Sequence, residues 1–225
     1  MTNPDWIIGI DEAGRGPLAG PVAVGAVAMR FDDYNKEKLI AEKIHDSKKL
    51  TEKGREKWFE WMKAETKAGR MHYVVSLVSA RTIDEHGIVS SIAAGIKNCL
   101  DKLEKKIAMV YLEAELPSKP LLDNLAHYAG QIEILLDGGL KAPDKFTNQK
   151  TIIRGDESEP IISLASIAAK VTRDAMMIEL GKKFPNYGFE KHKGYGTKVH
   201  IEKILRHGIS LEHRISFCEG ITRQQ

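Results

Sequence analysis

Residues 6–29, WIIGIDEAGRGPLAGPVAVGAVAM, hold two short runs rich in Ile, Val and Ala, separated by a segment rich in Gly and Pro. Short apolar runs bounded by Gly and Pro are typical of buried strands. The first run, residues 6–10, ends directly at Asp11 and Glu12, and the second covers residues 20–29. This stretch therefore predicts the first two strands of a sheet, with two acidic side chains at the end of the first strand.

The rest of the chain alternates between strand-like and helix-like segments. We expect further strands at residues 71–78, 107–112, 132–136 and 151–153, and helices at residues 52–68, 82–104, 159–182 and 197–207. Thr51 is typical of an N-cap for the first of these helices. The alternation predicts an α/β domain with a central mixed sheet flanked by helices. We expect this domain to cover residues 1–182, with a basic loop and a helical C-terminal region, residues 183–225, packed on it.

The composition is that of an ordinary globular protein, with 225 residues, 42% of them apolar and 29% charged. The longest apolar stretch, about residues 17–29, is too short to span a bilayer, and the N-terminus has no signal-like run. We therefore expect a cytoplasmic protein with no membrane partner. The two cysteines, Cys99 and Cys218, exclude a dense disulfide framework, and we expect both to be small buried side chains.

Basic residues gather near the C-terminus. Residues 182–225 carry nine Lys and Arg against four Asp and Glu, a local charge of +5, whereas the whole chain carries only +3. This asymmetry indicates a polyanionic partner, although a solvated, Lys-rich helical face is an alternative. Histidines also gather there but lack the spacing of zinc ligands, and we interpret them as surface or phosphate-contacting groups: His192, His200, His207 and His213.

Acidic residues lie at the ends of three predicted strands. Asp11 and Glu12 follow the first strand, Asp137 follows another, and Asp156 follows the short strand before the long helix. Ligands at such sheet edges are common in α/β proteins, and clustered carboxylates favour Mg²⁺ or Mn²⁺. Each acid alone could instead be a turn or cap residue. Asp174, beside an arginine in the middle of a helix, is interpreted as a structural ion pair.

Six blocks of sequence, in order along nearly the whole chain, resemble the ribonuclease HII family of prokaryotes. They are DEAGRGPLAGPV at residues 11–22, DSKKLT at 46–51, LDG at 136–138, RGD at 154–156 with LASIAAKVTRD at 164–174, YGFEKHKGYGT at 187–197, and HRISF at 213–217. The chain departs from the family pattern at Gly139, where Asn is usual, and at Arg154, where Lys is usual. Residues 113–130 resemble an insertion relative to compact members.

The resemblance implies a ribonuclease H-like fold and an endonuclease acting on nucleic acid. The family hydrolyses the RNA strand of RNA–DNA hybrids and cuts 5′ of ribonucleotides embedded in duplex DNA, leaving 3′-hydroxyl and 5′-phosphate ends. Two divalent ions, Mg²⁺ or Mn²⁺, can serve both sides of such an in-line displacement. The resemblance implies that the ions are held by the catalytic carboxylates of Asp11, Glu12, Asp137 and Asp156. We expect a monomer.

The resemblance also implies a set of substrate-binding residues. Gly14, Arg15 and Gly16 would form the loop that recognises the ribose 2′-hydroxyl, and Gly can admit a close backbone approach because it lacks a Cβ. Tyr195 would pack on the sugar next to the cut, and Lys48 and Lys49 would contact the nucleic-acid backbone. A plain tight turn for the glycines and a core position for the tyrosine are the structural alternatives.

Two other function classes are weighed against this hypothesis. One is a non-catalytic nucleic-acid-binding module, which the intact set of acids disfavours because clustered acids repel a polyanion. The other is a carboxylate–Mg²⁺ phosphatase acting on small molecules, which the basic C-terminal region and the Gly-Arg-Gly loop disfavour.

Overall fold

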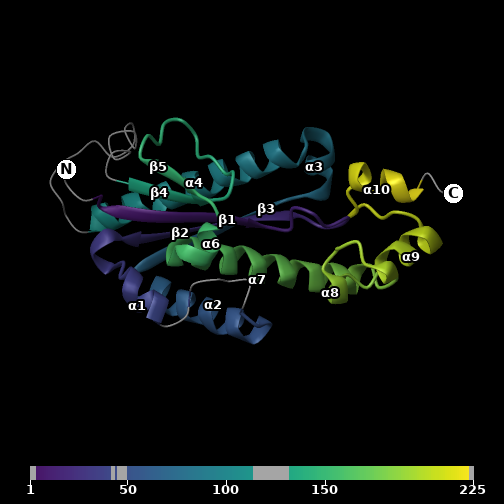
Figure 1. Ribbon diagram of the computed structural model, residues 1–225, viewed down its shortest axis with the longest axis horizontal. Coiled ribbons are helices and arrows are strands. Elements are labelled where there is room, and N and C mark those ends of the chain that lie inside the picture. The colour runs from purple at the N-terminus through teal and green to yellow at the C-terminus, as the bar shows by residue number, and fades with distance from the viewer. Residues whose placement is uncertain (1–3, 42–43, 45–49, 114–131, 223–225) are drawn as a thin grey trace.

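The structure is a computed structural model that describes residues 4–41, 44, 50–113 and 132–222. A central sheet lies between two layers of helices, and the C-terminal helices gather at one end of the molecule (Figure 1). Lys48 and Lys49, which were expected to contact the nucleic-acid backbone, lie outside the described residues, as does almost all of the segment 113–130.

The sheet has five strands in the order β3-β2-β1-β4-β5. These are β1 (Trp6–Ala13), β2 (Val22–Arg30), β3 (Met71–Val78), β4 (Ile132–Asp137) and β5 (Gln149–Ile152). Strand β1 pairs antiparallel with β2 and parallel with β4, while β2–β3 is antiparallel and β4–β5 is parallel. The sheet is therefore mixed, as the sequence predicts, and β1 lies at its centre.

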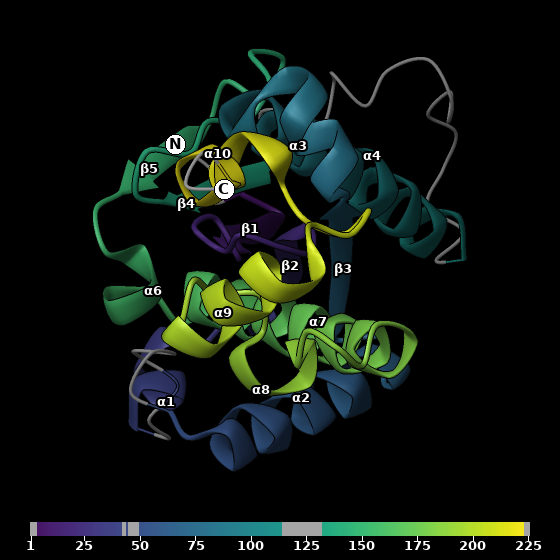
Figure 2. The same ribbon diagram turned by 90° about the vertical axis from the view of Figure 1, so that its right-hand side faces the viewer.

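Helices cover both faces of this sheet (Figures 1 and 2). The described elements are the 3-10 turn η1 (Phe31–Asp33), α1 (Lys36–Ala41), α2 (Glu52–Lys67), α3 (Ala80–His86), α4 (Ile88–Glu113), α6 (Gly155–Ser158), α7 (Pro160–Lys183), α8 (Phe189–His192), α9 (Lys198–His207) and α10 (Ile215–Thr222). One core forms between the sheet and α4, and a second forms between the opposite face, α7 and α2. Thr51 caps α2 as expected, accepting the Gly54 N–H at 3.1 Å.

The predicted strand at residues 107–112 is wrong, because these residues continue helix α4. The sequence IAMVYL is rich in strand-forming types, but Leu103 and Ile107 extend the buried stripe of the helix begun by Ile92 and Ile96. Helical spacing of 3 to 4 residues thus outweighs local strand propensity. The predicted helix at 82–104 is divided at Gly87, whose φ of 79° ends α3 and separates it from α4.

Helix α7 packs very close to the middle of the sheet because two strand residues have no side chain. A Cβ at Gly9 would lie 2.3 Å from the Ile161 carbonyl oxygen, and one at Gly25 would lie 2.2 Å from that of Ala165. Contact of this kind leaves space only for glycine. The close approach brings the polar residues of α7 to the end of β1.

The C-terminal helices lie at one end of the molecule, with α8 near the C-terminal end of α7 and α10 beside α3 (Figures 1 and 2). An isolated β-bridge joins Ala19 to His213, which ties this region to the loop between β1 and β2. The division of the chain at residues 182 and 183 stays a prediction. Within the described ranges, no helix combines the length and the apolar character needed to cross a membrane. Both cysteines are buried, with Cys99 0% and Cys218 1% exposed.

Candidate active site

Three acidic segments meet at one edge of the sheet. Ile10 on β1 pairs with Leu136 on β4, so the next residues along these parallel strands, Asp11 and Asp137, come at the same level, where the β1–β4 pairing ends. Both residues still belong to the sheet, since β1 continues to Ala13 and Asp137 pairs with Ile152. Asp156 comes from the short helix α6 after β5, and its backbone N–H donates to Asp137 Oδ1 at 3.3 Å. The parallel pairing of β1 and β4, which brings Asp11 and Asp137 together, joins residues more than 120 positions apart in the sequence.

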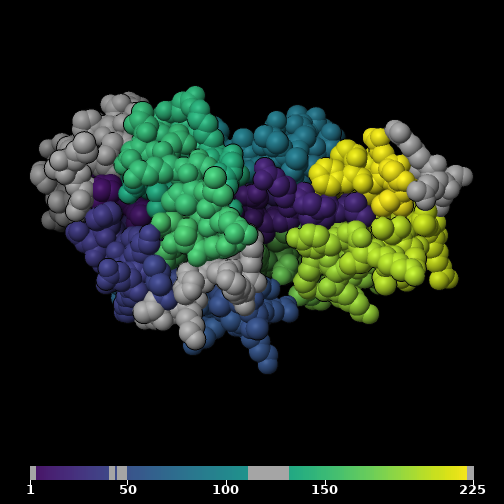
Figure 3. All heavy atoms as spheres, viewed as in Figure 1, coloured from purple at the N-terminus to yellow at the C-terminus, as the bar shows by residue number. Residues whose placement is uncertain are grey.

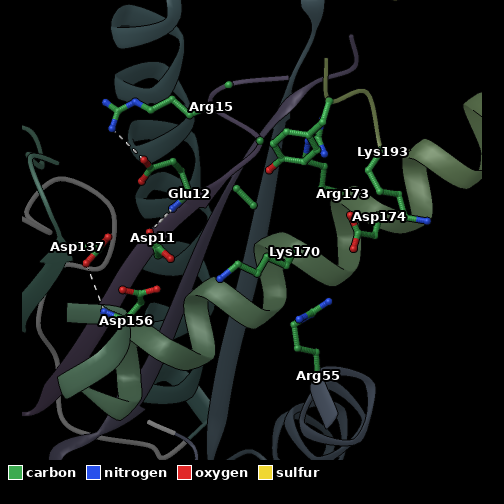
Figure 4. A pocket seen from close by; sticks show the side chains of 14 residues that line it. Asp11, Glu12, Arg15, Arg55, Asp137, Asp156, Lys170, Arg173, Asp174 and Lys193 are labelled. Atoms are coloured by element: carbon green, nitrogen blue, oxygen red, sulfur yellow. Dashed lines mark hydrogen bonds and ion pairs between the residues drawn. The ribbon is translucent and has the colours of Figure 1, made fainter. Parts of the chain in front are cut away.

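These acids line a cleft of about 520 Å³. Figure 3 shows the corresponding face, where the N-terminal segment reaches the surface between the segment that carries α6 and the C-terminal region. All the predicted site residues that the structure describes line this one cleft: Asp11, Glu12, Gly14, Arg15, Gly16, Asp137, Asp156 and Tyr195. Figure 4 shows Asp11, Asp137 and Asp156 close to one another, with Glu12 turned towards Arg15. The structure therefore brings the predicted residues together, while their roles stay predictions.

The carboxylates destabilise one another in their charged form. The pKa of Asp11 is raised to about 7, chiefly because the carboxyl group is buried and also because Glu12 and Asp137 repel its charge. A hydrogen bond with Ser166 and the charge of Lys170 oppose this shift. Burial also raises the pKa of Glu12, against the attraction of Arg15. A cation among these groups would remove the repulsion that raises the pKa values.

The carboxylate side chains of the cleft do not converge on a single point. Glu12 Oε1 accepts from the Arg15 guanidinium at 3.1 Å, and Asp137 Oδ1 is turned towards the backbone of Asp156. In the part of the chain that the structure describes, no group of three or more His, Cys, Asp or Glu side chains is arranged closely enough to hold a metal ion. The donors themselves, carboxylate oxygens from three segments, are those that Mg²⁺ and Mn²⁺ prefer.

The loop from Gly14 to Gly20 is held in place from behind by Arg214. The guanidinium of this buried arginine donates to the carbonyl oxygens of Gly14 at 2.7 Å, Arg15 at 2.9 Å and Gly20 at 3.0 Å. Gly14 has a φ of 85°, a conformation that side chains rarely adopt. The loop backbone is therefore rigid, while Arg15 and Gly16 are exposed.

Tyr195 lies across the cleft on the C-terminal region. Half of this residue, 50%, is exposed, so the alternative of a core aromatic is wrong. The Arg173 guanidinium lies 5.8 Å from the centre of its ring. Arg173 itself is buried and donates to the carbonyl oxygens of Pro21 at 2.9 Å and Ala19 at 3.3 Å.

Five charged residues in the cleft were not predicted as site residues: Arg55, Lys170, Arg173, Asp174 and Lys193. Helix α7 supplies three of them at positions 170, 173 and 174, a spacing that places them on one face. That spacing was readable in the block LASIAAKVTRD. The interpretation of Asp174 as an ion pair is incomplete, because Arg173 bonds to backbone carbonyls and Asp174 lines the cleft. Burial raises the pKa of Asp174, and Lys193 is the strongest opposing charge.

The interpretation of the C-terminal histidines as surface groups is wrong for two of them. His200 is 0% and His213 is 2% exposed, whereas His207 is exposed and His192 is half-buried. The two buried rings satisfy each other through a hydrogen bond between their Nε2 atoms at 3.1 Å. Their spacing in the sequence carries no helical or strand period that would reveal this pairing.

The chain is similar to one family of known proteins over nearly its whole length. The family model described as "Ribonuclease HII" matches residues 8–220. The chain belongs to the ribonuclease HII family. A relative named ribonuclease HII from Caldicellulosiruptor bescii is 42% identical over 216 residues, covering 96% of this chain and 88% of the relative. Another of the same name from Bacillus cereus is 41% identical over 213 residues, covering 95% of this chain and 69% of the relative.

Solved structures agree with this assignment. Ribonuclease H2 from Pyrococcus horikoshii has a TM-score of 0.62 and 25% identity, with 97% of this chain and 98% of that chain covered. Bst-RNase HIII in complex with Mn²⁺ has a TM-score of 0.63 and 16% identity, with 99% and 72% covered, which shows a shared fold. The predicted ribonuclease H-like fold and the family resemblance are confirmed. Members of this family cleave the RNA of RNA–DNA hybrids, and the chain is a ribonuclease.

Proposed function

We propose that this ribonuclease is an endonuclease that cuts RNA–DNA hybrids and also cuts 5′ of single ribonucleotides in duplex DNA, leaving 3′-hydroxyl and 5′-phosphate ends. One observation carries the proposal. Carboxylates from three separate segments, the Gly14–Gly16 loop and an exposed tyrosine line the same cleft. A hydrolytic site thus lies beside a surface that can contact a sugar, which is the combination needed to cut next to a ribose.

The donor set supports a metal-dependent reaction. Asp11, Glu12, Asp137 and Asp156 offer oxygen ligands only, and the pKa of Asp11 is raised chiefly by burial and also by the charges of Glu12 and Asp137, both of which disfavour a carboxylate without a bound cation. We propose that these four residues hold two Mg²⁺ or Mn²⁺ ions. Such ions, when bound, supply an activated water and stabilise the charge that develops on the leaving oxygen. The Mn²⁺ complex of the structurally similar Bst-RNase HIII is consistent with this proposal.

The chain's own residues would orient the substrate around these acids. The Gly14–Gly16 loop can bring backbone donors and acceptors to the ribose 2′-hydroxyl, the group that distinguishes RNA from DNA. Arg214 fixes this loop through three hydrogen bonds and so sets where those backbone groups lie. Tyr195 would pack on the sugar from the opposite side of the cleft.

Basic side chains in the same cleft would contact phosphates. Lys170 on α7 approaches the acids, and its Nζ donates to Ser166 Oγ at 2.7 Å (Figure 4). Arg55 and Lys193 lie further along the cleft, near Asp174. Positive groups along one groove suit a nucleic-acid backbone, and each phosphate contact should make binding weaker at higher salt.

The test is cleavage and binding by Asp11→Asn and Asp137→Asn variants. We expect both to lose cleavage of a labelled RNA–DNA hybrid in Mg²⁺ while retaining binding to the hybrid and a cooperative thermal transition. Lys141→Gln, an exposed change outside the cleft, is the control and should cleave normally. Full activity in either Asn variant would remove that residue from the site. Hybrid binding without cleavage by the unaltered protein would support a binding module, and turnover of a small phosphomonoester alone would support a phosphatase.

A further inference from the structure

Two buried histidines stand directly behind Tyr195. His200 lies in the first turn of α9, and His213 lies in the loop before α10. Their Nε2 atoms are 3.1 Å apart, and His200 Nδ1 lies 2.9 Å from the carbonyl oxygen of Tyr195. On the far side, the backbone N–H of Ser210 donates to His213 Nδ1 at 2.9 Å, and the Ser210 hydroxyl lies 2.8 Å from the same nitrogen and can donate to it as well. Side chains and backbone therefore form one continuous chain from Ser210 to Tyr195.

The hydrogen-bond partners determine where each proton lies. A carbonyl oxygen only accepts, so His200 Nδ1 carries the hydrogen and its Nε2 is a lone-pair acceptor. His213 must then donate from Nε2, which leaves its Nδ1 free of hydrogen, as the Ser210 N–H requires. Both ends thus give the same assignment, with each ring neutral and in a different tautomer.

The surroundings favour this neutral state. Burial lowers the pKa of both His200 and His213 to about 4; the charge of His192 lowers the pKa of both rings further, and that of His200 lowers the pKa of His213. The titratable groups that face the pair are His192, whose ring stacks on His200 at 4.2 Å, and Tyr187, whose ring meets His213 at 4.9 Å. In the described part of the chain, no ion pair joins a carboxylate to either ring. A further proton on His200 would place its Nε2–H against the Nε2–H of His213.

The series of hydrogen bonds from Ser210 through the two histidines ends at the backbone of Tyr195, whose side chain is exposed. The Tyr195 carbonyl accepts from His200 and also from the backbone N–H of Thr197 at 2.8 Å, while the Tyr195 N–H donates to the His192 carbonyl at 2.9 Å. The tyrosine ring, by contrast, is half exposed over Arg173. The ring therefore faces the cleft from a backbone whose position is set on both sides.

We propose that His200 and His213 are positioning residues that fix Tyr195 for contact with the ribose next to the cut. This inference rests on the sugar-packing role proposed for Tyr195. The pair touches no reacting atom. The pair fixes the position of the Tyr195 backbone beside the cleft. Loss of the pair should therefore weaken cleavage at a single ribonucleotide more than cleavage of a long hybrid, in which every nucleotide of the RNA strand carries a ribose.

Two amide substitutions of His213 separate the effect of the hydrogen bond between the histidines from the effect of their packing. His213→Gln places an amide near the position of the His213 Nε2 atom, so the variant can still donate to His200. His213→Asn places its amide near the position of the Nδ1 atom, so Ser210 keeps a partner but His200 loses its donor. The measured quantity is the ratio of kcat/KM on a duplex with one ribonucleotide to kcat/KM on a long hybrid. A general loss of folded protein lowers both values and leaves this ratio unchanged.

We expect His213→Asn to lower the ratio roughly five- to tenfold, the kinetic equivalent of about one hydrogen bond. His213→Gln should stay within about twofold of the unaltered protein, as should His207→Asn, a control at an exposed histidine of the same region. Tyr195→Ala should lower the ratio, and adding His213→Asn to it should cause no further decrease. An unchanged ratio in His213→Asn or in Tyr195→Ala, or independent effects in the double variant, would overturn the proposal.

A second measurement does not depend on cleavage. Long-range ¹H–¹⁵N spectra of the histidines at neutral pH should show the Nδ1–H form of His200 and the Nε2–H form of His213. The opposite tautomers would refute the proposed hydrogen bonding of His200 and His213 even in a fully active enzyme. An unaltered protein that cuts neither substrate but shows the expected tautomers would instead contradict the proposed function, and with it the role assigned to the two histidines.

Discussion

Alanine substitutions at Gly14 and Gly16 should separate the structural role of the loop from its contact with substrate. A Cβ at Gly14 would lie 2.0 Å from Arg173 Nε and 2.5 Å from its Cδ, and the φ of 85° disfavours any side chain. At Gly16 nothing lies within 4 Å of the added carbon. The two positions are in one loop, so they form a matched pair for measurements of stability and of cleavage.

Two effects should lower the free energy of unfolding of the Gly14→Ala variant. The left-handed backbone conformation costs an alanine about 1–2 kcal/mol. Displacing Arg173, which donates to the carbonyls of Ala19 and Pro21, disturbs hydrogen bonds to a charged group worth about 1.5–3 kcal/mol each. Gly14→Ala should therefore lower the free energy of unfolding by about 2.5–5 kcal/mol if one such bond is lost. Gly16→Ala should leave it unchanged or raise it by up to about 1 kcal/mol.

Urea denaturation followed by circular dichroism measures these differences, and cleavage of a duplex with one ribonucleotide measures function. Gly16→Ala should cleave poorly despite its normal stability, because the added methyl group meets the sugar. A Gly14→Ala variant as stable as the unaltered protein would refute the account of the loop's packing. A Gly16→Ala variant with full activity would refute close approach of the substrate to that glycine.

Three further outcomes are expected. Arg214→Lys should lower the free energy of unfolding by about 2 kcal/mol or more in urea, since lysine cannot reach three loop carbonyls, whereas Arg206→Lys at an exposed site should not. Asp11→Asn should raise the melting temperature in EDTA at pH 8, because it removes a charge disfavoured by burial and by neighbouring acids, and Mg²⁺ should then stabilise it less than the unaltered protein. Between about pH 6.5 and about pH 4, the unfolded chain takes up protons on His200 and His213 before the folded chain does, which lowers the free energy of unfolding, whereas the raised pKa of Asp11 acts in the opposite direction. The free energy of unfolding should therefore fall more steeply with decreasing pH in the unaltered protein than in His213→Gln; equal slopes in this range would contradict the neutral pair.

Much of the fold could be predicted from local pattern. The apolar runs around residues 6–29 correctly predicted the two central strands, and the helical stripe of residues 159–182 correctly predicted α7. Residues 107–112 were misread because a short run of Ile, Val and Leu satisfies both strand and helix preferences. Only the continuation of the stripe from Ile92 to Ile107 distinguishes the two.

The site could be predicted in its exposed part but not in its supporting part. The acids were found because they follow strands, and strand ends meet at one edge of a sheet. Arg214 belongs to the HRISF block, but its role could not be predicted because its partner Gly14 lies 200 residues away in the chain. The pairing of His200 with His213 depends in the same way on tertiary contacts that spacing does not encode.

The central claim is that the acids and the Gly14–Gly16 loop form one site that cuts beside a ribose. The most direct measurement is cleavage of a labelled DNA duplex carrying one ribonucleotide, in Mg²⁺, in Mn²⁺ and in EDTA. We expect a cut on the 5′ side of the ribonucleotide that leaves a 3′-hydroxyl, requires the divalent ion and is absent in EDTA. Cleavage that persists in EDTA, or none on this duplex while a long hybrid is cut, would contradict the claim.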